Sequence, residues 1–307
     1  MLVTPPSKRA LVAFAATLPL AACAPDGDHA PVASFCEAPA HYFHCGMRNM
    51  AHRGGSKLAP EDTLAAFENA NALGVDVLEM DLHSTADGDI VVLHDDTVDR
   101  TTEGSGPVTS FTLDDLQSLD AAYHFSLDGG ATFPWRGTGV VVPTLDAVLA
   151  AFPNAHLSIE IKQLEPSIVG GVLDLLDAHD ARERVVIASF FDPVMADLRA
   201  RAPDLLTTYT LSEMFQWSLL TEADDAAYIP PAPVVQAPID TLTDEMIALA
   251  QRHGVAVQVW TVNDRAEMDR LIRLHVNGIL TDDPVTLADA IADQIADAHA
   301  FASDAAR

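Results

Sequence analysis

The sequence is poor in basic residues, and this shortage limits the partners that the protein can have. It has 17 lysine and arginine residues against 45 aspartate and glutamate residues, which gives a formal net charge of −28. Removing residues 1–22, which hold two basic and no acidic side chains, takes that charge to −30. A field of this sign repels nucleic acid, so the composition excludes a nucleic-acid partner. An anionic small molecule must then be attracted locally, by cations inside its binding site.

The sequence also lacks an apolar run long enough to cross a bilayer. The apolar run at 10–22 follows Lys8-Arg9 and has the length of the apolar core of an export signal. It ends in LAAC at 20–23, which resembles the processing site of bacterial lipoproteins. We therefore expect residues 1–22 to be a signal peptide and Cys23 to carry a lipid anchor in the cell envelope or periplasm of a bacterium. The alternative is an ordinary secretory signal followed by a chance cysteine.

Cysteine is scarce, and two of the three cysteines, Cys36 and Cys45, remain for the exported chain. The surrounding segment, residues 23–46, is rich in proline and alanine without periodicity, which is typical of a tether. In an oxidising compartment we expect a Cys36–Cys45 disulfide, which contributes about 2–3 kcal/mol in the chain-entropy model. His41 and His44 lie between the two cysteines, so a zinc site remains the alternative.

A glycine-rich phosphate loop is missing, since HRGGS at 52–56 does not have that pattern, and this argues against an open doubly wound sheet. Short apolar runs instead alternate with helical patterns, as in parallel βα units. Strands are expected at 48–52, 75–82, 155–161, 184–189, 205–210, 233–237, 255–260 and 277–281. Helices are expected near 62–73, 144–152, 167–179, 192–201, 241–253, 264–274 and 284–297. Eight strands over about 250 residues predict an α/β fold, the (β/α)8 TIM barrel, within residues 47–307.

A long segment, residues 96–142, interrupts this rhythm and is expected to be an insertion after the second strand. Loops of this length are usually functional or form a small subdomain. The segment contains a short helical pattern at 113–119, and after it come five aromatic or imidazole side chains: Tyr123, His124, Phe125, Phe133 and Trp135. These side chains either line the binding pocket or form the insertion's own small core, and the sequence leaves both possibilities open.

Two carboxylates lie two residues apart on the second expected strand, Glu79 and Asp81. Such side chains point to the same face of a strand, about 6–7 Å apart. The apolar neighbours Val75, Val77 and Leu78 imply burial, and buried carboxylates need a partner. All-oxygen ligands suit Mg²⁺ or Ca²⁺ better than zinc, so we expect one divalent cation here.

Other reactive residues fall at or near the carboxyl ends of expected strands, which is where barrel enzymes have their active sites. They are His52, Arg53, His94, Glu160, Lys162 and Trp260. Two histidines, an arginine and a carboxylate pair are the groups needed to cleave a phosphoester. Each also has an ordinary interpretation, because a lone histidine more often caps or fills a core, and Glu160 and Lys162 share a strand face and can simply pair.

Several motifs together resemble the glycerophosphodiester phosphodiesterase family: HRG at 52–54, PE-x-T at 60–63, E-x-D at 79–81 and HD at 94–95. Later segments agree, namely IEIK at 159–162, VWTVN at 259–263 and GILTDDP at 278–284. The resemblance implies a metal-dependent hydrolase that converts glycerophosphodiesters to sn-glycerol 3-phosphate and an alcohol. It implies the following roles: His52 and His94 as the acid–base pair; Glu79, Asp81, Glu160 and, more weakly, Glu61 as ligands of one Ca²⁺ or Mg²⁺; Arg53, Lys162 and Trp260 as substrate contacts.

Two positions depart from the family pattern, Asp62 where asparagine is usual and Asn277 where aspartate is frequent. Asp62 suits the start of a helix, so we expect little change from it. Two other functions stay open. One is a phospholipase acting on lysophospholipids or other lipid phosphodiesters, and the other is a non-catalytic envelope lipoprotein.

Overall fold

The computed structural model describes residues 42–43, 46–220 and 225–305, all of which belong to one compact unit, Phe35–Arg307. The expected signal peptide, Cys23, most of the tether and the Cys36–Cys45 pair lie outside the described residues. Within the described part of the chain, no helix is both long and apolar enough to cross a membrane.

Eight parallel strands form the barrel wall, in the order β6-β5-β4-β2-β1-β9-β8-β7, and the isolated bridge between Thr208 and Val234 joins its two ends. The strands are β1 (Arg48–Ala51), β2 (Val77–Ser84), β4 (His156–Ile161), β5 (Val185–Ala188), β6 (Leu206–Thr207), β7 (Val234–Pro238), β8 (Ala256–Trp260) and β9 (Gly278–Thr281). A ninth strand, β3 (Ile90–Val92), pairs antiparallel with β2. The expected barrel is confirmed, and each of its eight strands lies where the sequence pattern predicts it.

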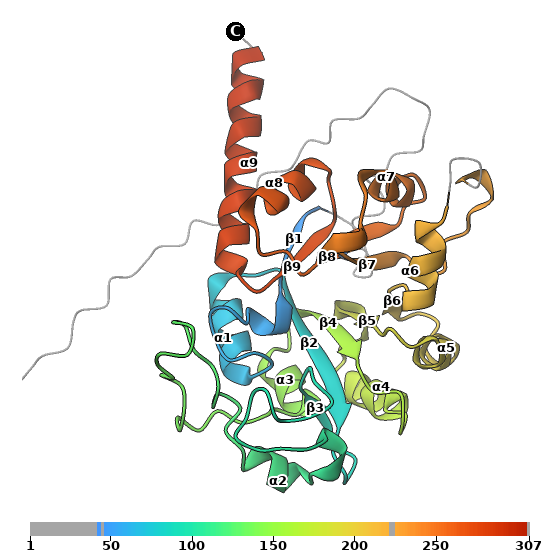
Figure 1. The fold of residues 1–307 in the computed structure, drawn as a ribbon. Helices are drawn as coiled ribbons and strands as arrows, with labels where there is room; N and C mark the ends of the chain where they lie inside the picture. The colour runs from blue at the N-terminus through green and yellow to red at the C-terminus, as the bar shows by residue number, and fades with distance from the viewer. Residues whose placement is uncertain (1–41, 44–45, 221–224, 306–307) are drawn as a thin grey trace, which may run out of the picture. The chain divides into compact units, whose positions relative to one another are not determined.

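The helices surround these strands (Figure 1). They are α1 (Leu64–Leu73), α2 (Leu113–Gln117), α3 (Leu145–Ala151), α4 (Val169–Ala178), α5 (Asp192–Arg201), α6 (Leu211–Ser218), α7 (Asp244–Arg252), α8 (Arg265–Arg273) and α9 (Pro284–Ala305). All except α6 match expected helical segments. The α6 helix begins with a capping box, in which Thr210 and Glu213 each bond the other's backbone N–H.

The barrel interior is apolar near the amino ends of the strands and polar nearer their carboxyl ends. An apolar cluster fills the lower end: Phe43, Met50, Val77, Val186, Val234, Ala256 and Leu280. Above it, the side-chain amide of Gln236 donates to Ser158 Oγ at 2.8 Å and to Gln258 Oε1 at 2.9 Å. This apolar cluster fills the amino-terminal end of the barrel, which leaves the carboxyl ends of the strands as the place for reactive groups.

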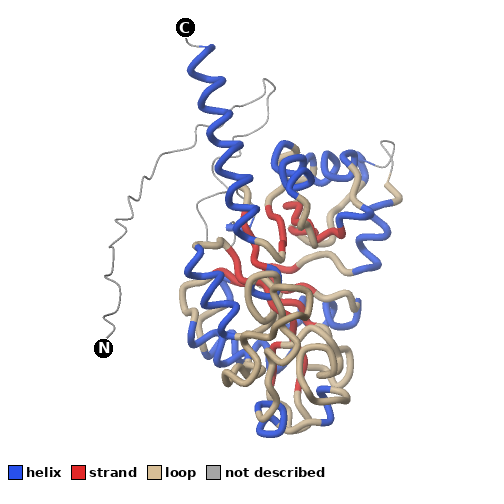
Figure 2. Tube along the Cα trace, turned by 60° about the vertical axis from the view of Figure 1, so that its left-hand side comes forward, coloured by secondary structure: helices blue, strands red, loops and turns tan. Residues whose placement is uncertain are grey.

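The insertion lies between β3 and α3 and consists mostly of loops, as Figure 2 shows. Its core is aliphatic: Val91, Leu93, Val98, Val108, Leu116, Ala121 and Val142. The Arg136 guanidinium lies between the rings of Tyr123 and Phe133, 4.0 Å from each centroid. These aromatic side chains therefore form a small cluster of their own, while His124 and Phe125 line a cavity beside Arg100.

Candidate active site

Three carboxylates meet at the carboxyl end of the barrel because they come from two paired strands. Glu79 and Asp81 point inward from β2, and Glu160 lies opposite Asp81 in the β2–β4 register. Each residue offers an oxygen, and these oxygens all lie within 4.8 Å of one another. Glu79 and Asp81 are buried, and Glu160 is nearly so.

The carboxylate oxygens have the character expected of metal ligands. Asp81 Oδ2 and Glu160 Oε1 are buried and have no hydrogen-bond partner. Burial, followed by the charge of Asp81, raises the pKa of both Glu79 and Glu160 to about 7. Buried carboxylate oxygens that lack a hydrogen bond are stabilised by a cation nearby. An all-oxygen set of this kind fits a hard divalent ion such as Ca²⁺ or Mg²⁺.

Two basic side chains border the carboxylates. The backbone N–H of Arg53 donates to Glu79 Oε2 at 2.8 Å, and its Nε lies 3.3 Å from Asp81 Oδ2. Arg53 has a φ of 52°, a left-handed conformation that directs this backbone N–H at the site. The Lys162 ammonium lies 2.8 Å from Glu160 Oε2 and 3.4 Å from Asp81 Oδ1. These cations are the local positive charge that an anionic substrate needs in so acidic a protein.

His52 follows directly after β1 and is held by a carboxylate. Its Nδ1–H donates to Asp282 Oδ1 at 2.7 Å. Ser56 Oγ and Asn263 Nδ2 also donate to Asp282, at 2.7 and 2.6 Å. Burial alone lowers the pKa of His52, but the hydrogen bond to Asp282 and the charge of Glu79 outweigh it, so the net pKa is raised. The pKa of Asp282 falls to about 2, because these contacts outweigh its own burial.

His94 follows β3 and has a different environment. Its Nδ1–H donates to Asp95 Oδ1 at 2.6 Å, which leaves Nε2 as the acceptor nitrogen. Burial is the main cause that lowers the pKa of His94 below its ordinary value. The backbone carbonyl of His94 also accepts a hydrogen bond from Nε2 of the buried His83, at 3.2 Å. His83 thus has a structural role, because it holds the backbone of His94.

One cavity of about 150 Å³ is lined by both histidines, both basic side chains and two of the three carboxylates, Glu79 and Glu160. Trp260, the last residue of β8, also lines it, and its indole N–H donates to the Gln236 carbonyl at 3.0 Å. Phe190 lies beside Trp260 with ring centroids 5.8 Å apart. Sequence reasoning assigned no role to Phe190, Tyr209 or Asp282. Asp282 lies within the GILTDDP segment, whose position at a strand end was the available signal.

Glu61 stands apart from the three-carboxylate group. Its oxygens accept from Arg53 Nη1 at 2.9 Å and from Arg100 at 2.6 and 2.7 Å. These contacts outweigh the effect of burial and lower the pKa of Glu61. Its role as a metal ligand remains a prediction. In the structure it links Arg53 to Arg100, which in turn donates to Asp95 at 2.7 Å.

Asp62 was expected to act as a helix-start residue and to change little, but the structure gives it a different environment. Thr63 is the N-cap of α1, since its side chain accepts from the backbone N–H of Ala66. Asp62 itself is buried at a φ of 54°, and neither carboxylate oxygen has a hydrogen-bond partner. Burial and the charges of Asp81 and Glu61 raise its pKa well above the ordinary value. The raised pKa favours the protonated form of Asp62, so the extra acid adds a buried, largely neutral carboxyl group beside the site.

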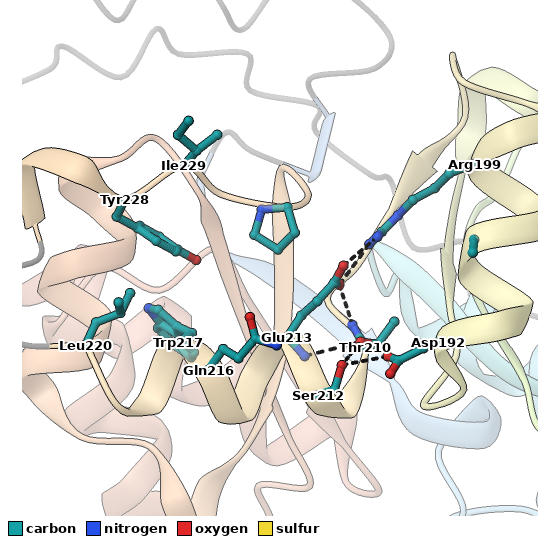
Figure 3. A pocket seen from close by; sticks show the side chains of 12 residues that line it. Asp192, Arg199, Thr210, Ser212, Glu213, Gln216, Trp217, Leu220, Tyr228 and Ile229 are labelled. Atoms are coloured by element: carbon teal, nitrogen blue, oxygen red, sulfur yellow. Dashed lines mark hydrogen bonds and ion pairs between the residues drawn. The ribbon is translucent and has the colours of Figure 1, made fainter.

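A larger cavity, of about 540 Å³, lies between α5 and α6 (Figure 3). Arg199 lines this cavity, and its guanidinium donates to both carboxylate oxygens of Glu213, at 2.6 and 3.0 Å. Asp192 Oδ1 accepts from the Ser212 hydroxyl at 2.8 Å. Its charged groups are paired with one another, so the smaller cavity at the strand ends is the better candidate for chemistry.

Known proteins share this fold and much of this sequence. The model of the "Glycerophosphoryl diester phosphodiesterase family" matches residues 52–286. A glycerophosphodiester phosphodiesterase of Caldanaerobacter subterraneus subsp. tengcongensis is 35% identical over 251 residues, 79% of this chain and 96% of its own length. A glycerophosphodiester phosphodiesterase of Bacillus subtilis is 32% identical over 244 residues, which are 76% of this chain and 83% of its own length. The crystal structure of a putative glycerophosphoryl diester phosphodiesterase from Silicibacter pomeroyi has a TM-score of 0.71 at 27% identity, covering 84% of this chain and 98% of its own.

Proposed function

The chain belongs to the glycerophosphoryl diester phosphodiesterase family, as a phosphoric diester hydrolase acting on glycerophosphodiesters, and we propose how its site residues divide the work. The products are sn-glycerol 3-phosphate and an alcohol. The observation that carries the proposal is that the cluster of Glu79, Asp81 and Glu160 borders a cavity lined also by His52 and His94. Membership of this enzyme family argues against the alternative function, a non-catalytic envelope lipoprotein.

Charge stabilisation comes from two sources. Glu79, Asp81 and Glu160 would hold one Ca²⁺ or Mg²⁺, which when bound supplies positive charge to the phosphoryl oxygens. Arg53 and Lys162 line the same cavity and add fixed positive charge beside it. Trp260 forms an apolar wall for the part of the substrate that carries no charge.

The two histidines have opposite roles in this proposal. The hydrogen bond to Asp282 raises the pKa of His52 and favours its protonated form, so we assign His52 as the donor of a proton to the leaving alkoxide. Burial keeps His94 neutral, and its Nε2 accepts the proton of the attacking oxygen. The support for this assignment is the opposite direction of the two pKa shifts, which is how environments separate an acid from a base.

Substitution of each histidine tests the assignment. We expect His52→Ala and His94→Ala each to lower kcat on glycerophosphocholine by about 10²–10⁴-fold, the usual contribution of a general acid or base. His275→Asn is a matched control, since His275 is exposed and has a φ of 57° that asparagine tolerates. Circular dichroism checks the fold of each variant. Near-normal turnover in both alanine variants would contradict the proposal.

The cation is tested separately, by calorimetric titration of Ca²⁺ and Mg²⁺ into chelator-treated protein. We expect a heat of cation binding in the wild-type protein and none in the double variant that carries both Glu79→Gln and Glu160→Gln. Hydrolysis that persists after exhaustive chelation would remove the metal from the proposal.

We also propose that the chain is exported and held in the envelope or periplasm by a lipid on Cys23. The support is the basic pair, the apolar run and the LAAC sequence at 20–23. Mass spectrometry of the protein purified from membranes should find an acylated N-terminal peptide starting at Cys23. A free thiol at Cys23, or an intact residue 1–22 segment, would contradict this.

A further inference from the structure

One side of the catalytic cavity is bordered by exposed apolar side chains, Leu164, Phe191, Leu211 and Phe215, here called the apolar rim. Their exposed fractions are 39%, 37%, 57% and 64%. Isolated apolar side chains are common on protein surfaces, whereas a contiguous group beside a site marks a contact surface.

The apolar rim is contiguous because its residues come from three neighbouring loops. Strands β4, β5 and β6 are adjacent in the barrel wall. The loop after each strand lines the cavity and exposes an apolar residue just beyond its last lining residue: Leu164 after Lys162, Phe191 after Phe190, and Leu211 after Tyr209. The backbone N–H of Leu211 donates to the Phe190 carbonyl at 3.5 Å and joins two of these loops.

The α6 helix extends the apolar rim outward. Leu211, Phe215 and Leu219 are spaced by four residues, so they lie on one face of the helix, and all three are exposed. The buried face of α6 carries Met214 and Trp217 instead. The apolar side of α6 is thus wider than the part that the protein buries, and an exposed apolar strip of this kind is expected to have a partner.

The charge of this part of the chain indicates what the partner is. The sequence has no lysine or arginine between Arg201 and Arg252, a stretch that includes all of α6. Proteins bind anionic lipids through clustered basic residues, and such residues are missing here. The basic side chains nearest to this face, Arg199 and Lys162, are each paired with a carboxylate, Glu213 and Glu160. The face therefore fits an uncharged or zwitterionic lipid surface.

The length of the tether permits this contact. Tyr42 stacks on His156, the first residue of β4, at the end of the barrel opposite the catalytic cavity. Cys23 lies 19 residues before Tyr42 in the sequence, and a fully extended segment of that length reaches about 65 Å. A six-residue strand spans only about 20 Å. An anchor at Cys23 therefore leaves the catalytic end free to turn toward the bilayer.

We propose that the apolar rim docks on a zwitterionic lipid surface and holds the catalytic cavity against it. The cavity then takes phosphodiesters that lie at that surface as well as those in solution. The inference rests on the proposed export and lipid anchor, which bring the chain to a membrane.

Site-specific quenching tests the docking. Full-length Phe215→Trp and Leu73→Trp proteins are placed on phosphatidylcholine vesicles with and without brominated phosphatidylcholine, with the wild type as the baseline for native tryptophans. Leu73 is a matched control, because it is 46% exposed on α1 and lies near the amino ends of the strands. We expect several-fold stronger quenching at position 215 than at 73, unchanged by high salt. Equal quenching at the two positions would overturn the proposal.

Two further readouts distinguish lipid docking from self-association and from a failure of the proposed chemistry. Emission of Phe215→Trp that depends on protein concentration without lipid, and not on brominated lipid, would assign the apolar rim to a second copy of the chain and overturn the proposal. Hydrolysis of glycerophosphocholine without vesicles reports on the proposed function alone. Normal hydrolysis with equal quenching refutes only the docking, and position-specific quenching without hydrolysis refutes only the proposed chemistry.

Discussion

Asp282 is the residue that sets the behaviour of His52. It accepts from His52, Ser56 and Asn263 together, and these contacts fix its orientation. A carboxylate on Nδ1 fixes the ring tautomer and favours the protonated imidazole. The proton that His52 is proposed to deliver thus depends on a residue from the opposite end of the chain.

Replacing this carboxylate should change the pH dependence of turnover. In Asp282→Asn the pKa of His52 falls, because the anion that raises it is gone. Activity needs protonated His52 and neutral His94, so the alkaline limb of the kcat–pH profile moves to lower pH while the acid limb stays in place. The profile on glycerophosphocholine measures both limbs. A shifted acid limb with a fixed alkaline limb would reverse the two assignments.

Asp62 should weaken the fold as pH rises. Its pKa is raised in the folded state, so the folded protein binds a proton that the unfolded chain has lost, and stability falls between the two pKa values. Asp62→Asn removes this loss. At neutral pH we expect the free energy of unfolding to rise by about 1.4 kcal/mol for each unit by which folding raises the pKa of Asp62. Urea unfolding at neutral pH and at pH below the ordinary aspartate pKa checks it, since the gain should vanish in acid.

The sequence could locate the site residues that depend on strand periodicity. Glu79 and Asp81 share a face because they are two apart on a strand, and His52 and Trp260 lie at strand ends. Asp62 was misjudged because its burial depends on how α1 meets the barrel. Propensity at the start of a helix does not contain that information.

At the scale of elements, α6 shows where pattern analysis fails. Its capping box is visible in the sequence as Thr210 followed by Glu213. Its apolar residues Leu211, Met214 and Phe215 also recur at helical spacing. The helix is only eight residues long, however, which is shorter than the window over which such a period can be distinguished from a loop.

The insertion should depend on its own core for stability. Leu116 is completely buried in the aliphatic cluster of the insertion. We expect Leu116→Ala to lower the free energy of unfolding by about 2–5 kcal/mol, the range for a leucine removed from a core. Leu113→Ala is the control, because Leu113 is only partly buried against the same cluster. Similar urea midpoints for the two variants would show that the cluster does not act as a core.

At the scale of the whole molecule, the net charge of −28 should influence substrate choice. An anionic diester such as glycerophosphoglycerol is repelled at a distance, whereas zwitterionic glycerophosphocholine is not. Salt screens this repulsion, with a Debye length of about 10 Å at 0.1 M. The ratio of kcat/KM for the anionic to the zwitterionic diester should therefore rise with ionic strength. A ratio that falls would show that the local cations dominate the long-range field.

The number of backbone pairs that join neighbouring strands differs around the barrel wall. β1 and β9 are joined along four residue pairs, but β6 is two residues long and meets β7 only through the Thr208–Val234 bridge. A large apolar cluster packs on each side of this junction. Local opening requires the fewest broken backbone hydrogen bonds here. Thr208 and Tyr209 lie at both the junction and the cavity, so a transient parting of these two strands widens the catalytic cavity from the side without unfolding either half of the protein.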